Sequence, residues 1–159
     1  MSLSKQIAQH VRDIYFGKNW TNSNIKEKLE DVDWKQAMTQ VNSYNTIAML
    51  VFHTNYYLAG IMNVLKGGTL DIRDKFSYEL PPLESEEEWQ KLKNKAFDEA
   101  EEYAKLIEQM PDDKFWENFV KEGYGNYYRN IHGSIEHLYY HFGQIVLIKK
   151  SILEVDNPV

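Results

Sequence analysis

The chain has 159 residues, a formal net charge of −6 at pH 7, 43% hydrophobic residues and 26% charged residues, so we interpret residues 1–159 as a single globular domain. The acidic balance argues against nucleic acid and against an anionic membrane surface as partners, because both attract cationic proteins. Because the chain has no cysteine, disulfides, a cysteine nucleophile and sulfur-ligated metal sites are excluded, and any metal would take nitrogen or oxygen ligands.

The first helix is predicted over residues 4–16, where Ile7, Val11 and Ile14 recur at helical spacing. His10 lies on the side away from this stripe and is expected to be exposed. The N-terminal stretch is amphipathic, mixed in charge and without a long apolar run, so it resembles neither a signal peptide nor a membrane span. We therefore expect a soluble, cytoplasmic protein.

A connector follows over residues 18–44. Two short helical pieces, IKEKLEDV and DWKQAMTQV, are expected within it, since a wholly structureless linker of this length is unusual in a compact domain. Its length allows a crossover between the long helices. The side chains expected to anchor this connector to the core are Trp20, Leu29, Val32 and Trp34.

The second long helix is predicted over residues 45–65, with Ser43 or Asn45 as its cap. An apolar stripe follows helical spacing through this segment. His53 lies inside the stripe, one turn after Leu50 and one turn before Tyr57. We therefore expect His53 to face the interior of the protein.

A loop over residues 69–84 contains two consecutive prolines, which forbid a helix there. The third helix then has the clearest start signal in the chain. Ser85 and Glu88 are spaced as a capping box, and three glutamates occupy the first turn, where the helix dipole favours negative charge. The helix is predicted to continue to Met110, because Pro111 stops it.

The fourth helix is predicted over residues 126–152 and carries three of the five histidines. At about 100° per residue, His137 and His141 lie about 40° apart on one face, one turn apart along the axis. Gln144 falls about 20° from His137, one further turn along. His132 lies about 140° from His137 and about 180° from His141. His132 therefore belongs to another face, at a helix–helix or subunit contact.

These elements, with no convincing strand, predict an all-α protein built as a four-helix bundle. The last six residues, 154–159, are expected to be frayed.

Three histidines are candidate metal ligands. Two ligands on one helix hold a transition metal poorly, but a third from a facing helix makes an open site in which water or substrate takes the remaining positions. His137 and His141 would supply two ligands and His53 the third. The alternative is that these histidines only pack and form hydrogen bonds in the core. The HExxH signature of zinc proteases is absent.

Two segments carry a family resemblance: HLYYHFGQI, residues 137–145, and NTIAMLVFHTNYY, residues 45–57. The first is similar to the terminal-helix motif of the DinB-like (YfiT-like) metalloenzyme superfamily, and the second resembles the second helix of that family. The spacing of the two segments and the total length also fit, so the resemblance covers essentially the whole chain. It implies a four-helix bundle in up-down-down-up order with a long first crossover connection, and a homodimer.

The resemblance also implies a divalent metal, zinc or nickel, on His53, His137 and His141, the same three histidines that the helical geometry selects. Gly143 and Gln144 match the family motif as well. Gly143 would let a neighbouring helix approach closely. Gln144 would orient a ligand or line the pocket, and the alternative is a partly exposed glutamine without a role.

Three functions stay open. The first is a metal-dependent enzyme, for which the family resemblance suggests a thiol-dependent S-transferase or isomerase acting with a low-molecular-weight thiol such as bacillithiol or mycothiol on an unidentified small-molecule substrate. Metal-assisted hydrolysis is a weaker version, because no general base is evident. The second is a non-catalytic stress-response or binding bundle with a structural or vestigial metal site. The third is a metal-free helical scaffold that dimerises through aromatic faces.

Overall fold

The computed structural model describes the backbone of residues 1–156 and the side chains of residues 1–153. Within this part the chain is helical, with no strand beyond an isolated bridge between Asn118 and Asn126. The prediction of an all-α protein is confirmed. The α-helices are α1 (Leu3–Tyr15), α2 (Ile25–Leu29), α3 (Trp34–Met38), α4 (Ile47–Leu65), α5 (Glu86–Glu108) and α6 (Tyr127–Asp156), and the 3-10 helices are η1 (Asp74–Tyr78), η2 (Asp112–Trp116) and η3 (Glu122–Tyr124).

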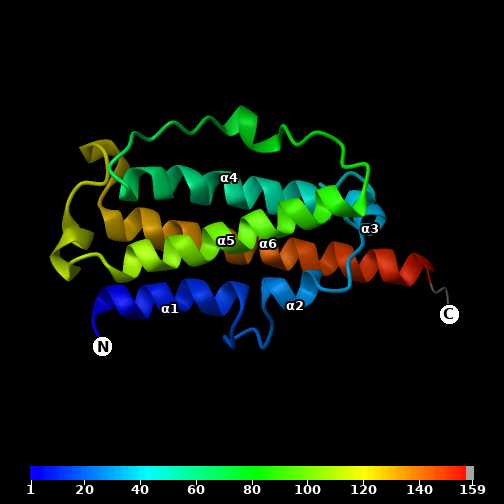
Figure 1. The fold of residues 1–159 in the computed structure, drawn as a ribbon, viewed down its shortest axis with the longest axis horizontal. Helices are drawn as coiled ribbons and strands as arrows, with labels where there is room; N and C mark the ends of the chain where they lie inside the picture. The colour runs from blue at the N-terminus through cyan, green and yellow to red at the C-terminus, as the bar shows by residue number, and fades with distance from the viewer. Residues whose placement is uncertain (157–159) are drawn as a thin grey trace.

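The four long helices α1, α4, α5 and α6 form the body of the molecule (Figure 1). Helix α5 packs against α1 and α4, and α4 also packs against α6. Their inward faces share one hydrophobic core, which includes the fully buried Trp89, Tyr103 and Leu138. The packing of α4 on α6 brings His53 toward the two histidines of the terminal helix.

Helix α4 begins two residues later than predicted. Its N-cap is Thr46, whose side chain accepts a hydrogen bond from the Met49 N–H, rather than Ser43 or Asn45. Helix α5 begins as predicted, with the Ser85 hydroxyl accepting from the Glu88 N–H. The reciprocal bond of the capping box is shifted, since the Glu88 carboxylate accepts from the Glu84 N–H at 2.7 Å.

The first connector contains α2 and α3 and packs through Leu29 and Val32, both buried as predicted. Trp34 is half-buried against the core. The prediction for Trp20 is wrong, because this side chain is fully exposed. Its backbone lies in a turn closed by the Asn22 N–H donating to the Asn19 carbonyl, and a residue at the tip of such a turn points outward.

The second connector, residues 66–85, runs back along the length of α4 in Figure 1 and carries η1. The long crossover was expected in the first connector, whereas the segment that spans the length of the helices is this second one. Gly60 permits its close approach, because a Cβ at that position would lie 2.4 Å from the Ile72 side chain. Helix η1 consequently packs on α4, next to His53.

The C-terminal helix is longer than predicted. Its backbone continues through residues 154–156, where fraying was expected, and residues 157–159 lie outside the described part of the chain. None of the helices described combines the length and apolar character that a membrane crossing requires.

Candidate metal centre

His53 from α4 converges with His137 and His141 from α6. The Nε2 atom of His137 lies 3.1 Å from Nε2 of His53 and 3.0 Å from Nε2 of His141. One nitrogen from each of the three rings falls within 4.8 Å of the others. The structure therefore brings together the three histidines that the sequence nominates as ligands.

Local helix geometry explains the convergence. His137 and His141 are four residues apart, so their side chains leave α6 on one face, one turn apart. His53 belongs to the buried stripe of α4 and is only 3% exposed. Because α4 packs on α6 along this stripe, the His53 ring reaches the pair on the neighbouring helix.

The outer nitrogens of two of these rings are engaged by acceptors. Nδ1 of His141 lies 2.8 Å from the Gln144 amide oxygen, which can only accept, so this nitrogen carries the proton. Nδ1 of His53 lies 3.0 Å from the Ser77 hydroxyl, which itself donates to the Asp74 carbonyl and therefore accepts from His53. Both rings are thus held with Nδ1 protonated and the Nε2 lone pair directed into the cluster.

A shared proton or a single cation can lie between ring nitrogens this close together. Two metal–nitrogen bonds of about 2.0–2.1 Å at angles of about 90–110° separate their nitrogens by roughly 2.8–3.4 Å. The observed separations of 3.0 and 3.1 Å between the Nε2 atoms fall within that interval. The residues present therefore fit a divalent transition metal of the kind that imidazole ligands favour.

The electrostatics of the cluster favour neutral imidazoles. Burial, followed by the neighbouring His141 and His53, lowers the pKa of His137 to about 4. Burial is also the main cause that lowers the pKa values of His53 and His141. All three rings are then neutral near neutral pH, and a neutral imidazole is the form that binds a metal.

Aromatic side chains surround the three rings. Tyr78, at the end of η1, stacks on His53 with ring centroids 4.2 Å apart. Tyr57 meets His53 and His137 edge-on, at centroid distances of 5.1 and 5.0 Å. The Tyr57 hydroxyl donates to the Asp74 carboxylate at 2.5 Å, and burial together with this carboxylate raises the pKa of Tyr57 to about 12.

Ser77 and Tyr78 were not nominated from the sequence. They lie in the loop predicted over residues 69–84, which has no periodicity to show which side chains face the protein. The only local signal is a cluster of polar and aromatic residues, which is equally typical of a surface loop.

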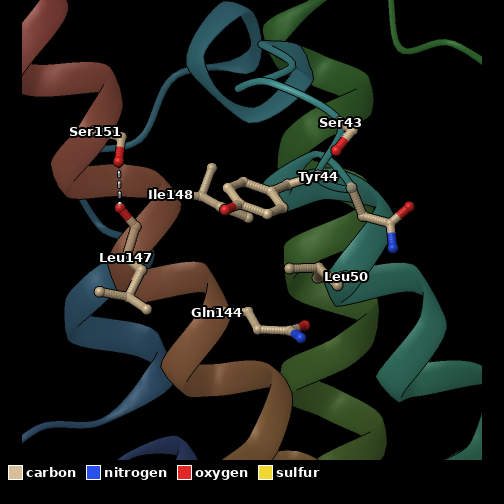
Figure 2. A pocket seen from close by; sticks show the side chains of 8 residues that line it. Ser43, Tyr44, Leu50, Gln144, Leu147, Ile148 and Ser151 are labelled. Atoms are coloured by element: carbon tan, nitrogen blue, oxygen red, sulfur yellow. Dashed lines mark hydrogen bonds between the residues drawn. The ribbon is translucent and has the colours of Figure 1, made fainter.

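A pocket of about 540 Å³ adjoins the cluster (Figure 2). Gln144 lines it from α6, opposite Leu50 on α4, and the Tyr44 ring lies near its other end. None of its lining side chains is charged: they belong to Ser43, Tyr44, Asn45, Leu50, Gln144, Leu147, Ile148 and Ser151. Gln144 thus borders the pocket, and its oxygen also binds His141, a candidate ligand.

The remaining residues singled out by the sequence lie elsewhere. His132 stacks on Tyr128 and lies 3.4 Å from the Glu136 carboxylate, away from the cluster as expected. His10 is exposed, as predicted. The interpretation of Gly143 is wrong, because a Cβ there would meet nothing within 4 Å and no helix of the described structure approaches it.

Comparisons with protein-family models, with curated proteins and with solved structures found no match. Any functional assignment therefore depends on the chemistry of the three histidines and their surroundings.

Proposed function

We propose that the protein is a divalent-metal-dependent enzyme whose metal, zinc or nickel, is held by His53, His137 and His141. The observation that supports this most directly is the convergence of three imidazole nitrogens from two helices, 3.0–3.1 Å between successive Nε2 atoms. Two of the three rings are also held in the required tautomer by Ser77 and Gln144.

The number of protein ligands favours an enzyme over a structural site. Structural zinc sites are closed by four protein ligands, whereas catalytic sites have three and leave a position for substrate. Here three histidines converge, and the described residues offer no carboxylate as a fourth member of the group. The non-catalytic bundle with a structural or vestigial metal site is the alternative.

The chemistry follows from the centre and the pocket beside it. A divalent metal on three neutral imidazoles acts as a Lewis acid and lowers the pKa of a thiol bound to it. The chain has no cysteine, so the thiol would come from a small molecule, as in a thiol-dependent S-transferase or isomerase. The uncharged pocket bordered by Gln144 is of a size that holds small organic ligands.

The DinB-like (YfiT-like) family and its up-down-down-up bundle belong to the same proposal. The motif HLYYHFGQI supports it, because it places both α6 histidines and Gln144 at the centre. The order of the helices is supported by Figure 1, in which residue numbers increase in one direction along α1 and α6 and in the opposite direction along α4 and α5. A homodimer is part of the proposal and is tested by the molar mass in solution.

Metal analysis of the purified protein tests the centre. The wild type, loaded with Zn²⁺ or Ni²⁺ and dialysed, is expected to retain one ion per chain, and His141→Ala is expected to lose it. A panel of small thiols with an electrophilic acceptor then separates a catalyst from a binding module. A wild type that retains no divalent metal under any loading condition would exclude the proposed enzyme, and a metal-loaded protein inactive with every thiol would favour the non-catalytic bundle.

A further inference from the structure

Tyr78 brings an oxygen to the histidine cluster. Its hydroxyl lies 3.5 Å from Nε2 of His53, at the long limit of a hydrogen bond. Within residues 1–153, this hydroxyl is the only group outside the three histidines that comes within hydrogen-bond distance of any of their Nε2 atoms. A tyrosine of η1 therefore brings its hydroxyl to the edge of the cluster.

The hydroxyl is held there by the segment that carries it. Ser77, the preceding residue, accepts a hydrogen bond from Nδ1 of His53, and Asp74 accepts one from Tyr57. Both bonds anchor η1 to α4. The Tyr78 ring is 41% exposed, whereas His53 beneath it is 3% exposed. Tyr78 therefore lies between His53 and solvent, on a side of the centre that a small ligand can reach.

The stacking geometry decides what the hydroxyl can do. A metal held by these histidines would be bound through their Nε2 lone pairs. The Tyr78 ring is stacked on the face of His53, with an angle of 27° between the ring planes. The hydroxyl therefore approaches Nε2 of His53 from the face of the ring. It is well placed to donate to something bound beside the metal.

We propose that the Tyr78 hydroxyl is the hydrogen-bond donor to the small ligand that takes the open position of the three-histidine centre. This inference depends on the metal centre proposed above. The ligand class is a small anion or lone-pair donor with oxygen, nitrogen or sulfur, such as a thiolate. Once the His53 lone pair is engaged, the phenolic proton has no acceptor there and turns to that ligand. Hydrogen bonds of this kind are often long before the ligand is present.

The test uses the full chain loaded with Co²⁺, whose visible absorbance reports what binds to it, and azide as the small anion. Tyr78→Phe keeps the ring stacked on His53 and removes only the hydroxyl. It is expected to bind Co²⁺ with an affinity within about twofold of the wild type, because no ligand is lost. Its dissociation constant for azide is expected to rise roughly tenfold, as for the loss of one hydrogen bond to a charged acceptor.

Tyr140→Phe is the matched control. This ring also contacts the cluster, 4.9 Å from the His141 ring, but it is 65% exposed and its hydroxyl makes no contact with an Nε2 atom in the described structure. Azide affinity is expected to be unchanged in this variant. Circular dichroism and thermal melting verify that both variants fold.

The other outcomes would overturn the inference in distinguishable ways. Equal azide affinity in the wild type and Tyr78→Phe would leave the hydroxyl without this role. Loss of Co²⁺ from Tyr78→Phe alone would make Tyr78 a ligand or an essential support instead of a donor. A wild type that binds Co²⁺ but no azide would lack the open position, and a wild type that binds no Co²⁺ would remove the metal centre itself.

Discussion

Nδ1 of His141 lies 2.8 Å from the side-chain oxygen of Gln144, one turn further along α6. This contact fixes the proton on Nδ1 and leaves Nε2 to face His137 and His53. Because Gln144 also borders the uncharged pocket, it connects the pocket wall to a candidate metal ligand through a single side chain. Gln144 follows His141 by three residues, so the two side chains are neighbours on one face of α6. The contact therefore depends on the helix alone.

Gln144→Ala is expected to weaken metal binding without abolishing it. Acceptors that orient ligating histidines typically contribute about 10–100-fold in metal affinity. A competition titration against a chromogenic zinc chelator measures the change. Ser151→Ala, which alters the same pocket without touching a histidine, is the matched control. An unchanged zinc affinity in Gln144→Ala would show that the contact with His141 does not support the centre.

Zinc is expected to raise the melting temperature of the wild type. A ligand present at about a hundredfold excess over its dissociation constant stabilises the folded state by about 2.7 kcal/mol, which corresponds to roughly 5–10 °C for a domain of this size. His137→Ala is expected to lose this shift, because His137 lies within 3.1 Å of both other rings. His132→Ala, on another face of α6, is expected to keep it. Differential scanning fluorimetry distinguishes the variants.

The metal-free protein is expected to lose stability in mildly acidic solution. An unfolded histidine has a pKa of about 6.5, whereas burial and the two neighbouring histidines lower the pKa of His137 in the folded state to about 4. Between these values the unfolded chain binds the proton more tightly, so acidification favours unfolding. The loss begins as the pH falls below about 6.5 and is complete once the pH has passed below about 4.

His137→Gln is the comparison for this effect, because it removes the titrating ring and keeps a polar side chain. Thermal melts of both metal-free proteins at pH 7.0, 5.5 and 4.5 measure it. The melting temperature of the wild type is expected to fall further from pH 7.0 to pH 4.5 than that of the variant. Parallel pH profiles for the two proteins would contradict the assignment to His137.

The sequence predicted best those features that depend on helical periodicity. His53, His137 and His141 were found because each lies at a defined angle on a regular helix, and His132 was set aside for the same reason. Trp20 was misplaced because its exposure depends on a turn held by Asn19. Ser77 was missed because the position of its loop is set by contacts across the fold, which local pattern does not encode.

The close approach at Gly60 offers a test of how the second connector is held on α4. A Cβ at Gly60 would lie 2.4 Å from the Ile72 side chain, whereas a Cβ at Gly133, also in a helix, would meet nothing within 4 Å. Replacing glycine by alanine within a helix normally stabilises it by about 0.5–1 kcal/mol. Gly133→Ala is therefore expected to raise the free energy of unfolding, and Gly60→Ala is expected to gain nothing or to lose stability.

Ile72→Ala provides the partner for a double-mutant cycle. If the Ile72 side chain is what the new Cβ of Gly60→Ala displaces, shortening Ile72 to alanine removes the clash. The double variant should then recover much of the stabilisation that alanine gives a helix. The two positions would show a favourable coupling of about 0.5–1.5 kcal/mol. Urea denaturation of the four proteins measures this coupling. Additive effects, or a Gly60→Ala variant as stabilised as Gly133→Ala, would mean that the connector does not press on α4 at this point. The segment carrying Ser77 and Tyr78 would then be held to the helix by its hydrogen bonds and by the stacking of Tyr78 on His53.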